Sequence, residues 1–325
     1  MATLETTFAG LKLKNPIIIS SSGLTDSAAK NQKLYEAGAG AIVLKSLFEE
    51  QIMMEADWLG DPNMYPEGSD YLVGYIREHK LGEYLNLIKE TKKVCDIPVI
   101  ASINCFSNSE WTDFARTVEA AEADALEINI LSLQTEKEYQ YGSFEQRHID
   151  IVSSIKKQIS IPVIVKLGSN LTNPIALINQ LYANGANAVV LFNRFYQPDI
   201  NIDTMTYSAG DVFSTPADLS NGLRWTAIAS AQVPQTDYAI SGGVHDGKAI
   251  VKAILAGASA VELCSVIYQR GNQAIADMTN EMTQWMNRQG YKDISEFKSS
   301  MNALSTGASN PFERTQFMKY FSSKE

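Results

Sequence analysis

Eight short runs of mostly apolar residues recur along the chain, and they predict eight buried β-strands. The runs lie in PIIIS (16–20), AGAGAIVLK (37–45), DIPVIASI (96–103), AEADALEIN (121–129), SIPVIVKL (160–167), NGANAVVLF (184–192), DYAIS (237–241) and AGASAVELC (256–264). Three of these segments repeat one pattern, in which Gly38, Gly185 or Gly257 ends a helix before the strand begins. Because parallel strands covered on both faces are apolar at almost every position, the runs predict a parallel sheet.

Helical segments fit between the predicted strands, with two longer connections. Eight parallel strands with intervening helices close most economically as a (β/α)8 TIM barrel, an α/β fold, with insertions at about 46–80 and 193–222. A doubly wound open sheet is the alternative, but no GxGxxG motif follows the first strand. We therefore predict one barrel domain over residues 1–325 with a C-terminal helical extension.

The extension runs from Asn272 to about Leu304 and has helical periodicity. Its apolar stripe consists of Ile275, Met278, Met282, Trp285 and Met286. Simple packing on the barrel explains such a stripe. The tail, SNPFERTQFMKYFSSKE, mixes aromatic and charged residues, and it could dock on its own barrel or on a partner subunit.

Polar residues follow the predicted strands at the end where a barrel carries its active site. They are Ser20, Ser21, Lys45, Ser46, Asn104, Asn129, Lys166, Asn193, Ser241, Gly242, Gly243, Cys264 and Ser265. Lys45 and Lys166 end apolar runs, where a charge costs desolvation energy unless an anion or an electron-rich ring compensates. Either lysine alone could be snorkelling or paired, but the pair together favours a bound anionic or flavin-like group.

The last two strand ends favour a phosphate site. Gly242 and Gly243 lie between a strand and a helix, where backbone N–H groups can approach a phosphate. Cys264 and Ser265 follow the next strand and can close on the same group. Barrels of this kind often bind phosphate after the seventh and eighth strands.

Composition and charge narrow the class of protein. Apolar residues make up 45% of the chain, and the formal net charge is −10, so we expect no nucleic-acid partner. The start, MATLETTFAG, is not a signal peptide, and no apolar run approaches the length of a membrane span. The three cysteines form no CxxC pair and predict neither a disulfide framework nor a metal site. We expect a cytoplasmic globular protein.

The chain resembles the dihydroorotate dehydrogenase family, most closely its soluble class 1 members and the pyrimidine domain of dihydropyrimidine dehydrogenase. The likeness runs from TTFAGLKLKNPIIISSS to KDISEFKSSMNAL, and SGGVHDGKAIVKAILAGASAVELCSVIYQRG is its most specific stretch. The resemblance implies that FMN binds at the strand ends. Its phosphate would contact Gly242, Gly243, Cys264 and Ser265. Its ring and ribityl chain would contact Ser20, Ser21, Lys45, Ser46, Asn129 and Lys166, with Asn104 as a looser candidate.

The resemblance also implies oxidation of dihydroorotate, or a related dihydropyrimidine, at C5–C6. A base after the fourth strand removes a proton while hydride passes to the flavin, and Lys45 joins the catalytic group. Where soluble class 1 members carry N-L-S-C-P-N, this chain has Asn129-Ile-Leu-Ser-Leu-Gln134. Ser132 therefore takes the place of the base, and Gln134 that of a substrate-binding asparagine. Ser132 would need a nearby group to accept its proton, and it could equally be only a loop hydroxyl.

The chain departs from the family pattern around the substrate. DPNMYPEGSDYLVGY (61–75) replaces the N-S-M-G-L-P-N segment that grips orotate, and Asn63 or Ser69 could substitute. Asn193 is followed by Arg194 instead of a small residue. Arg194 could bind a substrate carboxylate or form an outward salt bridge.

Two functions of different class remain open at this point. The first is an FMN-dependent dehydrogenase, with Lys45, Asn129, Gln134, Asn193 and Arg194 as its substrate-binding residues. The second is a flavin-binding family member with a different small substrate or no dehydrogenase activity. An aldolase-like barrel with a Schiff base at Lys166 leaves the phosphate segment without a role. Family analogy suggests a homodimer.

Overall fold

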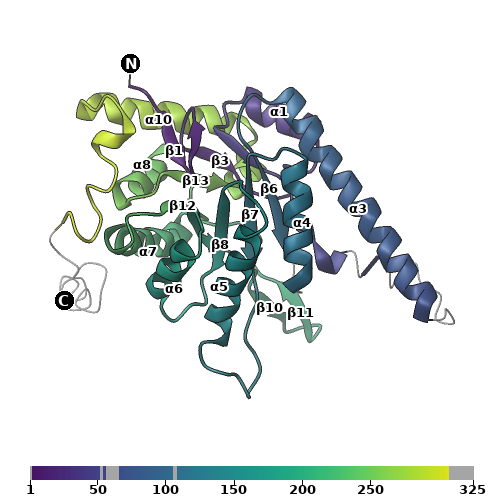
Figure 1. Cartoon of the computed structure of the whole chain (residues 1–325). Coiled ribbons are helices and arrows are strands. Elements are labelled where there is room, and N and C mark those ends of the chain that lie inside the picture. Colours follow the sequence, from purple (N-terminus) through teal and green to yellow (C-terminus); the bar gives the residue numbers. More distant parts are fainter. Residues whose placement is uncertain (1, 52–53, 56–65, 105–107, 307–325) are drawn as a thin grey trace.

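Eight parallel strands form a closed barrel with helices around it (Figure 1). The computed structural model of the chain describes residues 2–51, 54–55, 66–104 and 108–306. The barrel strands are β3 (Ile17–Ile19), β4 (Ala41–Val43), β6 (Val99–Asn104), β7 (Ala125–Ile130), β8 (Val163–Gly168), β9 (Ala188–Asn193), β12 (Asp237–Ser241) and β13 (Ala260–Leu263). Each predicted apolar run overlaps one of them, so the prediction of a TIM barrel is confirmed.

Strand pairing closes the sheet on itself. Neighbouring strands follow the order β4-β3-β13-β12-β9-β8-β7-β6, and β4 also pairs with β6 through Ile42 and Val99. The chain's first and last barrel strands are neighbours, with Ile17 opposite Val261. A short strand, β5 (Leu47–Phe48), adds to β6 beyond the end of β4.

Helices connect the barrel strands. They are α1 (Ala28–Glu36), α3 (Pro66–Val94), α4 (Asn108–Ala120), α5 (Ser143–Lys156), α6 (Pro174–Ala183), η1 (Pro216–Asp218) with α7 (Leu219–Gln232), and α8 (Gly247–Ala256). After β13 come α9 (Ser265–Arg270), α10 (Gln273–Gln289) and η2 (Ile294–Glu296). Gly257 ends α8 with a φ of 116°, as expected of a glycine at this position.

On four of the barrel strands and the residues that follow them, the side chains that point into the barrel change from apolar to polar toward the C-terminal end. Successive residues of a strand point to opposite faces, so every second residue faces the interior. Near the N-terminal ends, this face carries Ile18, Ala125, Ile164 and Ala260, which belong to one buried apolar cluster. Two residues further along, it carries Ser20, Glu127, Lys166 and Glu262, all of them buried. The strands therefore bring an apolar base and a polar upper layer into the same barrel.

A hairpin closes the N-terminal end of the barrel. Strands β1 (Thr6–Phe8) and β2 (Leu11–Leu13) pair antiparallel, and Phe8 and Leu13 pack into the apolar cluster at the base. Asp237 fixes the hairpin, because its carboxylate accepts the backbone N–H of Ala9 at 2.9 Å. Access to the barrel interior is thus restricted to the C-terminal ends of the strands.

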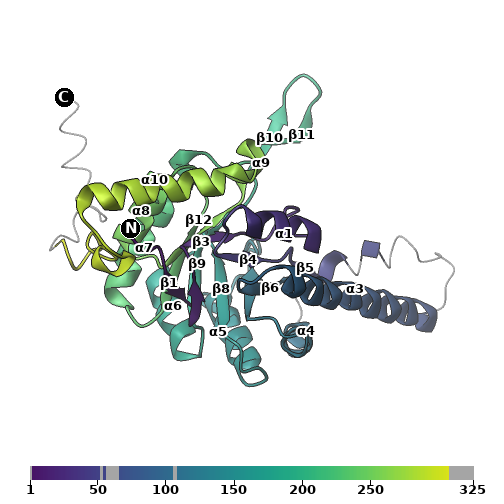
Figure 2. The ribbon, with the colours of Figure 1, turned by 90° about the horizontal axis from the view of Figure 1, so that it is seen from above.

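Two long connections extend beyond the barrel. Helix α3 follows β4 and reaches well past the other helices (Figure 1). Strands β10 (Pro198–Asn201) and β11 (Thr206–Ala209) follow β9 and form an exposed hairpin that projects from the molecule (Figure 2). The hairpin and about the first half of α3 lie in the segments that the sequence indicates as insertions, and α3 continues beyond the first of them.

The helical extension packs where its periodicity predicts. Met278, Met282 and Met286 of α10 are buried, and α10 lies against α8. Trp285 contacts the ring of Phe297 edge to face, with centroids 5.1 Å apart. The tail beyond residue 306 lies outside the described residues. In the described part of the chain, no helix is long and apolar enough to span a membrane.

Removal of the Phe8 side chain, which packs at the base of the barrel, tests this account of the fold. Phe8 is 1% exposed, so Phe8→Ala leaves a cavity and should lower the free energy of unfolding by about 3–5 kcal/mol in urea titrations. Tyr141→Ala is the control, because Tyr141 is 94% exposed and its loss should cost less than about 1 kcal/mol. Equal effects of the two substitutions would contradict the role of the hairpin as a buried plug.

Candidate functional site

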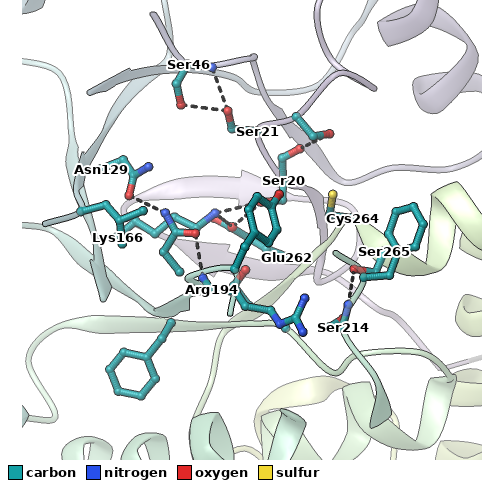
Figure 3. A pocket seen from close by; sticks show the side chains of 18 of the residues that line it. Ser20, Ser21, Ser46, Asn129, Lys166, Arg194, Ser214, Glu262, Cys264 and Ser265 are labelled. Atoms are coloured by element: carbon teal, nitrogen blue, oxygen red, sulfur yellow. Dashed lines mark hydrogen bonds and ion pairs between the residues drawn. The ribbon is translucent and has the colours of Figure 1, made fainter. Parts of the chain in front are cut away.

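A cavity of about 650 Å³ opens at the C-terminal ends of the barrel strands. Figure 3 shows its polar side chains, which come from both halves of the sequence and point toward one another. Strands β7, β8 and β13 and the segment that follows β3 supply the floor, and the loops after β9, β12 and β13 supply the walls. The volume is typical of sites for small molecules and cofactors.

Most of the residues expected from the sequence line this cavity. They are Ser20, Ser21, Lys45, Ser46, Asn129, Lys166, Asn193, Arg194, Gly242, Gly243, Cys264 and Ser265. Asn104, Ser132 and Gln134 do not line it. Asn104 is buried at the end of β6, and Gln134 is exposed. Asn63 lies outside the described residues, and the side chain of Ser69 is not described.

Lys166 occupies the floor of the cavity and is 5% exposed. Its Nζ lies 2.5 Å from Oε2 of Glu262 and 3.8 Å from Oε1 of Glu127. It also donates to Oγ of Ser20 at 2.9 Å, and that hydroxyl donates to Oε2 of Glu262 at 2.9 Å. Burial alone lowers the pKa of Lys166, but the two carboxyls outweigh this effect and raise it. Lys166 is therefore an ammonium ion at neutral pH.

The sequence analysis missed Glu127 and Glu262. Both lie two residues before the end of an apolar run, in DALEIN and AVELC, whereas only the strand ends were considered. An acidic residue inside a run that is otherwise apolar is the signal that could have identified them, because a buried carboxylate requires a partner. The compensation expected for Lys166 thus comes from the protein itself.

A chain of serine hydroxyls lies beside the floor. Oγ of Ser46 lies 2.9 Å from that of Ser21 and 2.7 Å from that of Ser102, and Oγ of Ser21 also accepts the backbone N–H of Ser46. Tyr84 of α3 anchors this chain, because its hydroxyl bonds to both backbone groups of Ser102. These bonds fix β3, β4 and β6 relative to one another where they reach the cavity.

The two glycines after β12 form a tight corner at one end of the cavity. Gly242 and Gly243 have φ values of 90° and 75°, which favour glycine. A Cβ on Gly243 would lie 2.1 Å from the backbone nitrogen of Leu219, whereas a Cβ on Gly242 would meet no atom within 4 Å. Gly243 is therefore required for packing, and Gly242 faces open space in which a ligand can approach the backbone.

Ser214 connects the loop after β9 to this corner. Its Oγ accepts the N–H of Gly243 at 3.2 Å, and its own N–H donates to Oγ of Ser265 at 2.9 Å. His245 lies 3.1 Å from the same hydroxyl, and burial lowers the pKa of His245. The sequence analysis did not single out Ser214, because it lies in an insertion without strand periodicity.

Arg194 lies on the cavity wall, where its side chain donates to the backbone oxygen of Val212 at 2.8 Å. No ion pair of Arg194 occurs among the described residues. Asn193 links this wall to the floor, because it donates to Oδ1 of Asn129 and accepts the N–H of Arg194, both at 2.8 Å. The position of Arg194 is thus compatible with a bound anion. Phe213 and Tyr268, with rings 5.6 Å apart, add an apolar surface nearby.

The two remaining candidates for catalysis differ in their access to the cavity. Lys45 is exposed and lines the cavity. The hydroxyl of Ser132 is buried and has no hydrogen-bond partner among the described residues. The preceding residue, Leu131, does line the cavity. Within the described residues, no group of three or more His, Cys, Asp or Glu side chains could hold a metal ion.

A TIM barrel with a polar cavity at the strand ends defines a class of barrel enzymes that act on small molecules. Residues 3–286 match the sequence pattern of the family described as "Dihydroorotate dehydrogenase". The chain belongs to the dihydroorotate dehydrogenase family, a family of oxidoreductases, and membership implies flavin binding in general.

Curated relatives support this membership over most of their length. The catalytic subunit of dihydroorotate dehydrogenase B (NAD(+)) from Thermoplasma volcanium is 28% identical over 305 residues, which cover 91% of this chain and 97% of the relative. The corresponding subunit from Caldicellulosiruptor bescii is 27% identical, with 92% and 99% covered. The NAD-dependent dihydropyrimidine dehydrogenase subunit PreA from Escherichia coli K12 is 23% identical, with 90% and 75% covered.

Lys166→Met tests the electrostatics of the floor. Loss of one partner of a buried ion pair should lower the free energy of unfolding by about 3–5 kcal/mol near pH 7. Without Lys166, burial raises the pKa of Glu262 above its unfolded value, so the variant regains stability at low pH and loses it as pH rises. Urea titrations from about pH 5 to 8 should therefore show a deficit that grows with pH.

The control for this substitution is Lys45→Met, which removes an exposed lysine of the same cavity. Its effect should stay within about 0.5 kcal/mol at every pH. A deficit for Lys166→Met that is small, or that does not depend on pH, would contradict the buried ion pair.

Proposed function

We propose that this protein is an FMN-dependent oxidoreductase that oxidises dihydroorotate or a related dihydropyrimidine. One observation carries the proposal: a single cavity joins the glycine corner at Gly242 and Gly243 to the buried ammonium of Lys166. FMN has a phosphate at one end and a polar ring system at the other, and it needs these two kinds of contact. When bound, FMN would supply a hydride acceptor.

The residues of the cavity fit this cofactor. The open space in front of Gly242 suits close approach of a phosphate, and Ser265 begins α9 beside it. Asn129 of β7 and Lys166 of β8 line the cavity and would hold the ring. Ser20 and Ser21, which follow β3, line the same cavity and would hold the ring as well. The ribityl chain would contact Lys45 and Ser46. Asn104 stays a looser candidate, because its side chain does not line the cavity.

The substrate would bind against the ring, where amide and basic side chains are available. Asn193 and Asn129 hold each other in place and can bond to the polar edge of a dihydropyrimidine. Lys45 and Arg194 reach the same cavity and would attract a carboxylate such as that of dihydroorotate. Gln134 belongs to the proposed substrate contacts only if the loop after β7 moves inward.

Ser132 is the proposed base, and its role also requires movement of that loop. Its hydroxyl follows the cavity-lining Leu131 and is not engaged in another hydrogen bond among the described residues. A rotation of the loop could therefore present it to the substrate without breaking an existing hydrogen bond of this hydroxyl. Serine would remove the proton from the substrate carbon and pass it to a neighbouring group or to water.

A homodimer is the proposed assembly. The support comes from the projecting β10–β11 hairpin, whose apolar side chains Ile200, Ile202, Met205 and Tyr207 are exposed. An exposed hairpin of this composition is typical of surfaces that pair with another chain. The relatives are named as catalytic subunits, so a separate subunit could supply the electron acceptor.

A second candidate is a family member that acts on a different small substrate or lacks dehydrogenase activity. The observation in its favour is that Ser132 and Gln134 lie outside the cavity lining while Arg194 lies within it. This arrangement preserves the cofactor end of the cavity and changes the substrate end. It predicts bound flavin that dihydropyrimidines do not reduce.

An anaerobic visible spectrum separates the two candidates. We expect the protein to carry flavin bands that bleach when dihydroorotate or another dihydropyrimidine is added, because hydride transfer reduces the flavin. Bands that persist with every dihydropyrimidine tested would reject the dehydrogenase and favour the second candidate.

The Ser132→Ala variant then tests the base. We expect the rate of flavin reduction to fall by about 10²–10⁴-fold while bound FMN is retained. Ser208→Ala is the matched control, because Ser208 lies on the exposed hairpin away from the cavity, and its rate should not change. Unchanged reduction by Ser132→Ala would assign the base to another residue.

A further inference from the structure

The floor of the cavity contains two acids and one base, and the three do not balance if all are ionised. Glu127 is 1% exposed and Glu262 is 2% exposed, and both line the cavity. Two carboxylates beside the single ammonium of Lys166 would leave one uncompensated negative charge in a place that water hardly reaches. Such a charge is costly, and buried groups usually change protonation instead.

Of the two acids, Glu127 has the weaker contacts with its neighbours. Neither of its carboxyl oxygens accepts a hydrogen bond from any donor among the described residues, and Lys166 approaches it only to 3.8 Å. Glu262, in contrast, accepts hydrogen bonds from both Lys166 and Ser20 through Oε2. A buried carboxyl group that accepts no hydrogen bond is more stable in its protonated, neutral form than as a carboxylate.

Among the described residues, the other groups that face these acids do not supply a second cation. Ser20 is neutral, and Cys264, which also lines the cavity, has a thiol pKa raised by burial. The phenol of Tyr84 also has a pKa raised by burial, and it bonds to the backbone of Ser102. Burial, and then the neighbouring carboxyl of Glu262, raise the pKa of Glu127 well above its ordinary value. For Glu262, the nearby Lys166 overcomes the effect of burial and lowers the pKa.

We propose that Glu127 and Glu262 share a single proton beside Lys166, so that the cavity floor is electrically neutral and presents a carboxylic acid to its ligand. The acid pair would then be a positioning element that sets the charge felt by the cofactor, and this second part rests on the proposed function. The shared proton itself does not depend on which ligand the cavity binds.

One consequence distinguishes sharing from two independent acids. If Glu262 is replaced by glutamine, the repulsion on Glu127 disappears, and Glu127 can ionise and pair with Lys166. If Glu127 is replaced, Glu262 remains ionised and paired. Either single substitution therefore leaves the floor neutral, and only the double substitution leaves Lys166 without a counterion. The effects on charge should be strongly non-additive.

Infrared spectroscopy of the purified protein, with any flavin removed, tests the shared proton. At about pH 8, where ordinary carboxyls are ionised, we expect one carboxylic acid band that Glu127→Gln abolishes. Glu262→Gln should abolish it as well, although Glu127 is still present. Glu78→Gln, a change at an exposed position of α3, should leave the band in place. Absence of the band from the native protein, or its persistence in either cavity variant, would overturn the proposal.

The affinity of the FMN-loaded protein for sulfite tests the charge of the floor. Sulfite is an anion that bleaches flavin absorbance, and positive charge near the flavin strengthens its binding. We expect each single variant to stay within about threefold of the native protein, and Glu127→Gln/Glu262→Gln to bind sulfite at least about tenfold more tightly. A double variant with native affinity, or a Glu262→Gln variant equal to the double, would overturn the neutral floor.

The two measurements fail independently. A protein that does not take up FMN contradicts the proposed function, yet its infrared spectrum still decides whether the proton is shared. If the double variant does not fold, the single variants still decide between sharing and independent acids, because the infrared result for Glu262→Gln differs between them.

Discussion

The charge of Lys166 lies inside a barrel where water cannot solvate it, and the architecture of the site follows from that constraint. Its ion pair with Glu262 spans the barrel from β8 to β13, and Ser20 of the β3 segment bonds to both partners. The strands on opposite sides of the interior are thus joined by polar contacts at one level. In a barrel with an entirely apolar interior, we would expect apolar side chains to fill this level instead of a polar cavity.

The period of two along each strand explains how an apolar core and a polar site coexist. Ile164 packs at the base of the barrel, and two residues later Lys166 reaches the floor of the cavity. The same step leads from Ala125 to Glu127 and from Ala260 to Glu262. Phe8 closes the opposite end. The residues that stabilise the barrel and the residues that line the site therefore lie in different layers of the same strands. Residues of the polar upper layer can change while the apolar layer at the base keeps its packing.

The sequence was sufficient for the barrel because its strands are short apolar runs with regular glycine and proline boundaries. It also indicated most of the cavity, since the C-terminal ends of parallel strands meet at one rim. Glu127 and Glu262 escaped because they lie before the strand ends, and Ser214 escaped because it lies in a connection without periodicity. Counting along the chain gives the position of Ser132 relative to Asn129. The direction in which a loop side chain points depends instead on its packing against the rest of the protein, which the local sequence does not determine.

The comparison between FMN and riboflavin tests the central claim most directly, because the two differ only in the phosphate that the glycine corner is expected to hold. Calorimetric titration of flavin-free protein should show one FMN bound per chain, with an affinity at least about tenfold higher than that for riboflavin. Equal affinity for the two flavins would contradict the phosphate site at Gly242 and Gly243. Binding of neither flavin would contradict the assignment of the whole cavity.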